Sequence, residues 1–339
     1  MNQRQFAGHV MISLVIAAAI AAGVWSVVRI DSSGEAGNRL GKEFAYELND
    51  YRRIDPAMIG WAEKATIPLK MHEPRVIAVG LDDSVVVAGD KTVCLHKADG
   101  TKTGGIALGD EPSCLAVAGR DHVSPGRIYV GLQDHVEVFE PDGEKVAVWK
   151  VPDGKRTMLT SIAVGEEEVF VADAGALLVW RYDVHGKLLG SIGKRDESRN
   201  IPGFVVPSPY FDVATAPDGL LRVANPGCHR VEAFTVEGDL EASWGKSGMA
   251  VEGFCGCCNP SHLAVFADGR VVTSEKGIVR VKLYGGDGVF RNVVVGPETL
   301  APMASEAAPP DVAVNSQGQV LVLDTKASCV RVYQEKSRQ

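Results

Sequence analysis

Residues 311–333 read DVAVNSQGQVLVLDTKASCVRVY, and this stretch holds three short apolar runs separated by polar turns. The first run is followed by a Ser-Gln-Gly turn, and the second run ends on Asp324. Short apolar runs bounded by glycine and polar residues are typical of β-strands joined as hairpins. The stretch therefore predicts three consecutive strands of one small antiparallel sheet.

The same arrangement recurs along the chain upstream of residue 311. An alanine in the first strand of each repeat returns at intervals of roughly 40–50 residues, a period typical of propeller blades. No segment after residue 60 has helical periodicity over ten or more residues. We therefore predict an all-β, six-bladed propeller. The aligned alanines are Ala78, Ala116, Ala163, Ala214, Ala264 and Ala313.

The sixth repeat reaches Gln339 without a fourth strand. An unassigned apolar segment, TIPLKM at residues 66–71, precedes the first repeat and could supply that strand. Pairing of the two parts would close the ring and remove an open sheet edge. We thus assign residues 66–339 to the propeller and residues 31–65 to a linker.

Two of the repeats resemble a known family. The stretches VANPGCHRVEAFTVEGDLEASWG (223–245) and DVAVNSQGQVLVLDTKASCVRVY are similar to NHL repeats, with their D-I-A-V start and a closing basic and apolar strand. The resemblance covers residues 73–339 and implies a six-bladed NHL-type propeller. It leaves function open, because propellers host many unrelated activities.

The N-terminus carries an apolar run, VMISLVIAAAIAAGVWSVV, at residues 10–28. About 20 apolar residues can span a bilayer, so residues 1–30 predict an uncleaved signal anchor and transmembrane helix. The propeller would then be membrane-anchored and extracytoplasmic, in a periplasm or at a cell surface. The alternative is secretion after cleavage at the A-x-A-like stretch 19–21. Which side of the membrane the domain occupies stays open.

Composition and motifs restrict the function. A net charge of −8 and an aromatic content of 6% disfavour a nucleic-acid partner, which needs a basic face or a stacking platform. The chain has no G-x-S-x-G, H-E-x-x-H, P-loop or dinucleotide fingerprint. A binding or scaffold role is therefore favoured over catalysis.

Polar residues gather at one end of the predicted blades. In a propeller, the starts of the inner strands and the ends of the second strands lie on one face, here called the top face. The first two repeats place apolar or small residues in these positions, whereas the last repeats place polar ones. We predict a site for a protein partner or a small ligand at the channel mouth of the top face. Its candidate members are Asp212, Asn225, His262, Glu275 and Asp311.

These residues also have a structural reading. Aspartates stand at these positions in the NHL pattern itself, which implies hydrogen bonds to turn amides between blades. His262 differs, because the pattern has a small or acidic residue there. It is either a functional group or a buried histidine with satisfied hydrogen bonds.

Cysteines cluster just before the fifth repeat, in the stretch EGFCGCCNPSH (252–262). In an exported domain they predict a disulfide, with Cys228 as a partner for one of the three. The alternatives are free thiols or a metal site in which Cys257, Cys258 and His262 hold copper or zinc. The spacing C-x-C-C matches neither a C-x2-C zinc pair nor a haem attachment site. The members of this group are Cys228, Cys255, Cys257 and Cys258.

Three functions follow as hypotheses. The first is a membrane-anchored propeller that binds a protein or a ligand. The second is a metal-dependent enzyme similar to the propeller lyases and lactonases, with Asp212, His262 and Asp311 around the metal and Glu275 as base. The third is an accessory protein for redox or copper chemistry that uses the Cys255–Cys258 loop.

Overall fold

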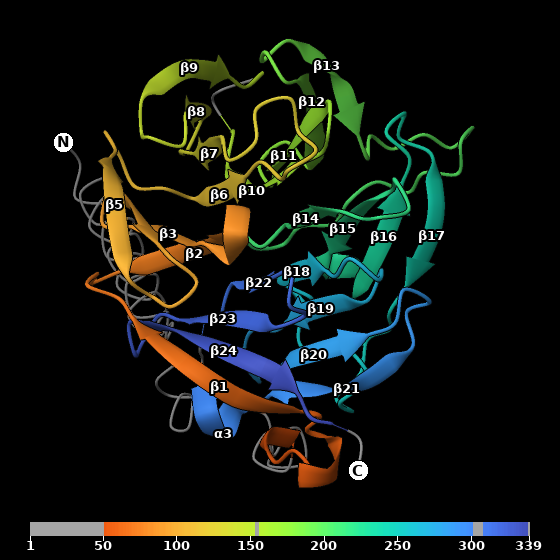
Figure 1. Cartoon of the computed structure of the whole chain (residues 1–339). Helices are drawn as coiled ribbons and strands as arrows, with labels where there is room; N and C mark the ends of the chain where they lie inside the picture. Colours follow the sequence, from red (N-terminus) through yellow and green to blue (C-terminus); the bar gives the residue numbers. More distant parts are fainter. Residues whose placement is uncertain (1–50, 153–155, 301–307, 338–339) are drawn as a thin grey trace, which may run out of the picture. The chain divides into compact units, whose positions relative to one another are not determined.

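Each predicted repeat is one four-stranded antiparallel sheet in the computed structural model, which describes residues 51–152, 156–300 and 308–337. The first strands of successive sheets contact one another in order and the last contacts the first, so the six sheets form a ring (Figure 1). The predicted six-bladed, all-β propeller is confirmed.

The strands of the six blades are given from the inner to the outer edge. Blade 1 holds β2 (Pro74–Val79), β3 (Val85–Gly89), β4 (Thr92–His96) and β5 (Lys102–Ala107). Blade 2 holds β6 (Cys114–Val117), β7 (Ile128–Gly131), β8 (His135–Phe139) and β9 (Lys145–Lys150). Blade 3 holds β10 (Leu159–Val164), β11 (Glu168–Asp173), β12 (Leu178–Asp183) and β13 (Leu188–Ile192).

Blade 4 holds β14 (Val213–Thr215), β15 (Leu221–Asn225), β16 (Arg230–Phe234) and β17 (Leu240–Trp244). Blade 5 holds β18 (His262–Val265), β19 (Val271–Ser274), β20 (Val281–Tyr284) and β21 (Phe290–Val295). Blade 6 holds β22 (Val312–Val314), β23 (Val320–Asp324), β24 (Cys329–Glu335) and β1 (Trp61–Pro68). The single helical turn η2 (Pro56–Met58) precedes β1, and three more lie between strands: η3 (Leu81–Asp83), η4 (Pro226–Cys228) and α3 (Pro297–Leu300).

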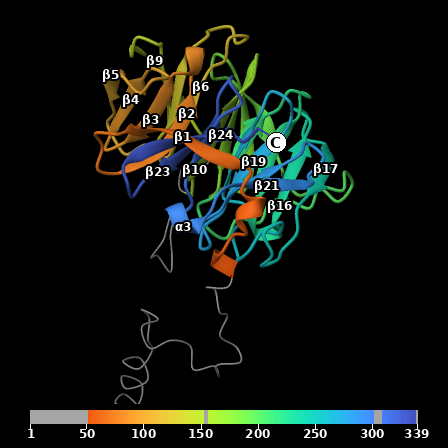
Figure 2. The same cartoon turned by 60° about the horizontal axis from the view of Figure 1, so that its bottom comes forward.

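The ring closes in blade 6, where β1 from the N-terminal part pairs with β24 from the C-terminal part (Figure 2). The register runs from Trp61 opposite Glu335 to Pro68 opposite Cys329. The closure is as predicted, but the strand starts at Trp61, inside the range that we assigned to a linker. Most of β1 is exposed, because it is the outer edge strand, and so its sequence carries too few apolar positions to mark a strand.

The core lies between neighbouring blades. Every residue of the second strands β3, β15 and β23 is buried, since both faces of these strands meet the adjoining sheets. Strands covered on both faces read as continuous apolar runs rather than alternating ones. Burial of this kind at about 25 cal/mol per Å² of apolar surface is what holds the blades together.

The predicted membrane anchor at residues 10–28 lies outside the described residues. Among the residues that are described, no helix has the length and apolar character needed to cross a bilayer.

Candidate functional site at the channel mouth

Three polar side chains meet where three inner strands begin. Asp212 directly precedes β14, His262 is the first residue of β18, and Asp311 directly precedes β22. One ligand-type atom from each side chain lies within 4.8 Å of those of the other two. The structure thus brings together three of the five residues predicted at the channel mouth.

The two aspartates join neighbouring blades through main-chain amides. Asp212 accepts a hydrogen bond from Val213 N–H (2.9 Å) and a second from Leu263 N–H (2.7 Å) in the next blade. Asp311 likewise accepts from the amides of Val312 and Ile77, both at 2.8 Å, and so links blade 6 to blade 1. Each carboxylate is therefore fixed in position on both oxygens.

His262 lies between the two carboxylates. Its Nδ1 is 3.6 Å from Asp212 Oδ2 and 3.6 Å from Asp311 Oδ1, which is longer than a hydrogen bond. Tyr210 packs against the imidazole in an edge-to-face arrangement with a centroid distance of 5.8 Å. The side chain keeps 18% of its surface exposed, so the group is reachable from the top face.

The three groups shift one another's protonation. Burial opposes a charge on His262, but the neighbouring carboxylates of Asp212 and Asp311 raise its pKa overall. Burial raises the pKa of Asp311 to about 6, with Asp212 adding to the effect and His262 opposing it. The site can therefore hold and release protons near neutral pH, which suits general acid–base chemistry or exchange of a proton for a cation.

The same three side chains have the donor set of a divalent-cation site. Carboxylate oxygens and imidazole nitrogen suit zinc or manganese better than copper(I), which prefers sulfur. No cysteine belongs to this group in the described part of the chain. The structure therefore does not join His262 with Cys257 and Cys258 into one ligand set.

Glu275 and Asn225 occupy interior positions at the ends of β19 and β15. Glu275 is fully buried and pairs with Arg280 Nε (2.6 Å) and Lys282 Nζ (3.2 Å). Asn225 is also fully buried and accepts from Val205 N–H while donating to Glu232 Oε1. Both have their hydrogen-bonding groups engaged within the protein, so neither offers a free group to a ligand.

The cysteine loop lies at the same end of blade 5. All of the cysteines predicted to pair or bind metal are free thiols, and Cys257 Sγ lies 3.0 Å from Cys258 Sγ, beyond the S–S bond length of about 2.0 Å. The predicted disulfide to Cys228 is not formed in this structure. The contact between the two loops is instead a hydrogen bond at 2.6 Å between His229 Nε2 and the Gly256 carbonyl oxygen.

Sequence reasoning missed Lys276, the residue after Glu275. Its ammonium group lies 5.3 Å from the centre of the Tyr210 ring and 3.5 Å from Ser208 Oγ. The positive charge of Lys276 also lowers the pKa of the Cys258 thiol and so favours its thiolate. The sequence did carry a signal, because Lys276 directly follows the end of the second strand of blade 5 on the top face. Our prediction included only the residue at the end of that strand, Glu275.

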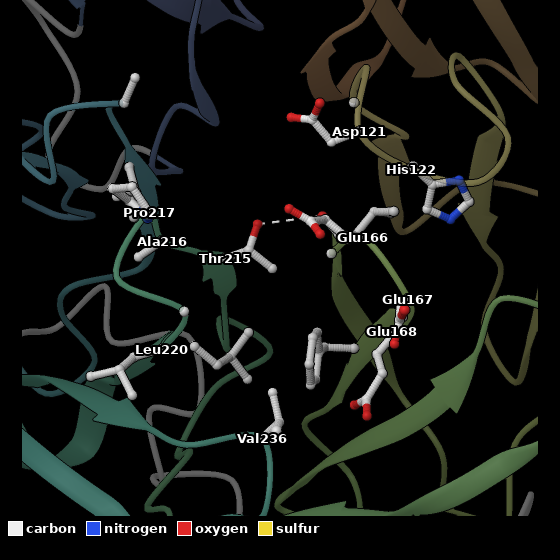
Figure 3. Close-up of a pocket in the computed structure, with 18 of the residues that line it drawn as sticks. Asp121, His122, Glu166, Glu167, Glu168, Thr215, Ala216, Pro217, Leu220 and Val236 are labelled. Atoms are coloured by element: carbon white, nitrogen blue, oxygen red, sulfur yellow. Dashed lines mark hydrogen bonds between the residues drawn. The ribbon is translucent and has the colours of Figure 1, made fainter.

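A separate cavity of about 720 Å³ opens at the opposite ends of the inner strands (Figure 3). Its lining includes Asp121, His122, Glu166 and Glu167 together with apolar residues of blades 3 and 4. Thr215 beside it donates to the Val164 carbonyl oxygen at 3.3 Å. None of the residues predicted from the sequence lines this cavity.

The fold and the repeats together define the class. The protein is a six-bladed β-propeller, and residues 308–333, which span most of β22 to β24, match the NHL repeat model. The predicted resemblance to NHL-repeat propellers is confirmed by this match. A search of the curated protein sequences gives no significant match.

Several solved structures share the fold at low sequence identity. A gluconolactonase from Xanthomonas campestris has 15% identity and a TM-score of 0.59, over 84% of this chain and 94% of that one. A catalytically inactive virginiamycin B lyase from Staphylococcus aureus, solved with quinupristin, has 11% identity and a TM-score of 0.53, over 79% and 83%. A protein of unknown function from Bacteroides thetaiotaomicron has 16% identity and a TM-score of 0.55, over 83% and 74%. At these identities the likeness shows the fold alone.

Proposed function

We propose that this protein is a membrane-anchored, extracytoplasmic propeller that binds a ligand or protein partner at the channel mouth. The observation that carries the proposal is the convergence of Asp212, His262 and Asp311 within 4.8 Å, with His262 and Asp311 only partly buried. Two carboxylates beside one imidazole leave a net negative charge when the imidazole is protonated. The mouth therefore suits a ligand that presents a cationic or hydrogen-bond-donating group.

The placement at a membrane and outside the cytoplasm rests on the apolar run at residues 10–28. Fusions of a periplasmic reporter enzyme and a cytoplasmic one to the C-terminus test it. Activity of the periplasmic reporter alone supports the proposal, and activity of the cytoplasmic reporter alone contradicts it. The mass of the purified protein shows whether the N-terminal segment is kept as an anchor or removed as a cleaved signal peptide.

Binding at the mouth can be tested by site-specific photo-cross-linking in native membranes. A photoreactive residue in place of Tyr210 probes the channel mouth, and the same residue in place of Glu167 probes the opposite end. We expect a discrete cross-linked product from position 210 that disappears with His262→Gln, and none that depends on His262 from position 167. Equal labelling from both positions, unaffected by His262→Gln, would rule out this site.

A second candidate is a metal-dependent enzyme. The cation-type donor set favours it, and two proteins of the same fold are described as a gluconolactonase and a virginiamycin B lyase. Asp212, His262 and Asp311 would hold the metal through lone pairs that the main-chain amides leave free, and the metal would supply Lewis acidity. Glu275 is unavailable as the base, because Arg280 and Lys282 neutralise it.

Elemental analysis of protein purified without chelator separates the two candidates. A near-stoichiometric divalent metal that is lost with Asp311→Asn and His262→Gln supports the enzyme. Folded protein without metal, whose cross-linked product still depends on His262, supports the binding module.

A further inference from the structure

The paired cysteines of blade 5 offer a second site that the channel mouth does not use. Cys257 is exposed, Cys258 is buried, and their sulfur atoms are 3.0 Å apart. A short contact between one accessible thiol and one covered thiol is the arrangement that stepwise disulfide exchange needs. The accessible sulfur can meet a substrate, and the covered sulfur can attack the resulting mixed disulfide.

The loop that carries the pair is fixed by side-chain hydrogen bonds. Asn259 donates to the carbonyl oxygens of Cys255 and Lys276 and accepts from the Lys276 amide. Ser261 donates to the Cys258 carbonyl oxygen at 3.1 Å. The two sulfur atoms are therefore held close by the loop itself and not by a covalent bond.

The charges around the pair distinguish between redox chemistry and metal binding. Burial opposes ionisation of Cys258, but its neighbours Ser208, Cys257 and Lys276 lower its pKa overall. The pKa of Cys257 is raised, chiefly because its thiol donates to Cys258. An ammonium group beside the sulfur stabilises a thiolate and repels a metal cation, so Lys276 favours thiol exchange over capture of a soft metal.

We propose that Cys257 and Cys258 form a redox-active dithiol that reduces disulfide-bonded substrates. The Cys258 thiolate takes the proton of Cys257, and the Cys257 thiolate attacks one sulfur of the substrate disulfide, whose S–S bond breaks. The first substrate sulfur leaves as a thiolate and takes that proton from Cys258. The Cys258 thiolate then attacks Cys257 Sγ, forms the Cys257–Cys258 disulfide and releases the second substrate sulfur as a thiolate, which takes a proton from water. The two protein sulfurs lose two electrons and the substrate disulfide gains them, with one proton from Cys257 and the other from the solvent.

The test uses the full-length chain in detergent, fully reduced and freed of reductant. It is incubated with glutathione disulfide in one arm and with a disulfide-cyclised peptide in the other, then alkylated and mapped. We expect a disulfide between Cys257 and Cys258 and release of two substrate thiols per protein. The faster arm identifies whether small-molecule or polypeptide disulfides are the better substrates.

Variants assign a role to each sulfur. Cys258→Ser should accumulate a mixed disulfide on Cys257, because the second step is blocked, and Cys257→Ser should form no adduct in the loop. Cys228→Ser and Cys255→Ser are matched controls and should react like the wild type. Lys276→Met should slow the exchange several-fold and move its pH profile upward, as loss of a nearby cation requires.

The proposal fails if the reduced wild type keeps both thiols in both arms. It also fails if Cys258→Ser carries no more adduct than the wild type, or if Cys255→Ser prevents the disulfide. Thermal melts of each variant ensure that a loss of reactivity is not a loss of fold.

Discussion

Two charged clusters occupy the upper ends of the last blades, and they use the same residue types differently. In the first, Glu275 is fully buried and pairs with Arg280 and Lys282, whose ammonium group also donates to the carbonyl oxygens of Val251 and Gly253. In the second, Asp212 and Asp311 accept main-chain amides while His262 lies 3.6 Å from both.

The difference lies in what neutralises each carboxylate. In the first cluster, Arg280 and Lys282 neutralise the carboxylate of Glu275. Burial lowers the pKa of Lys282 to about 8, although the charge of Glu275 opposes this shift. Main-chain amides fix the second cluster without cancelling its charge, so the partly exposed His262 can mediate contact with a ligand. A carboxylate that is paired with side-chain cations is structural, whereas one held by main-chain amides keeps its charge available to a ligand.

Glu275→Gln should give the largest loss of stability. It leaves Arg280 and Lys282 buried without a counter-ion, and breaking a buried pair costs roughly 3–5 kcal/mol. The free energy of unfolding from denaturant titration measures this loss, with exposed Glu167→Gln as the control. A loss no larger than that of the control would contradict the pairing of Glu275 with Arg280 and Lys282.

Asp212→Asn should cost less, about 1–3 kcal/mol, because it leaves one main-chain amide facing an amide –NH2 group without an acceptor. The affected bonds are one from Val213 within blade 4 and one from Leu263, which joins blades 4 and 5. Hydrogen exchange at the Leu263 amide should accelerate relative to amides in blade 2. Unchanged protection at Leu263 would show that the carboxylate does not join the blades.

His262→Gln should cost less again, and only at low pH. The pKa of His262 is raised above 6.5 in the folded protein, so the charged imidazole stabilises the fold below that pH. This contribution disappears as pH rises through the folded-state pKa. The stability difference between wild type and variant should therefore shrink from pH 5.5 to pH 9. A constant difference would indicate that the histidine is held by packing alone.

Lys276→Met should change stability least, by less than about 0.5 kcal/mol, because Lys276 is partly exposed and its contacts are a ring face and a hydroxyl. Its effect should appear in the alkylation rate of Cys258 instead. A loss comparable to that of Glu275→Gln would place Lys276 in the buried network.

The repeats in the sequence predicted the fold, its closure and the meeting of Asp212, His262 and Asp311, because strand starts in a propeller converge at one channel mouth. They could not predict that Glu275 is neutralised. Lys282 lies in the third strand of blade 5, and the loop of residues 246–254 covers its side chain. The position of a loop over a sheet does not appear in the repeat pattern of the sequence.

The pairing of β1 with β24 also affects how the protein is made. The two strands are separated by roughly 260 residues, so β1 leaves the ribosome long before its partner. At about 5–20 residues per second, it waits roughly 13–50 s with an unpaired edge. Five blades can assemble during synthesis while the sixth cannot, and the nascent chain therefore needs protection from aggregation until its last strand has emerged.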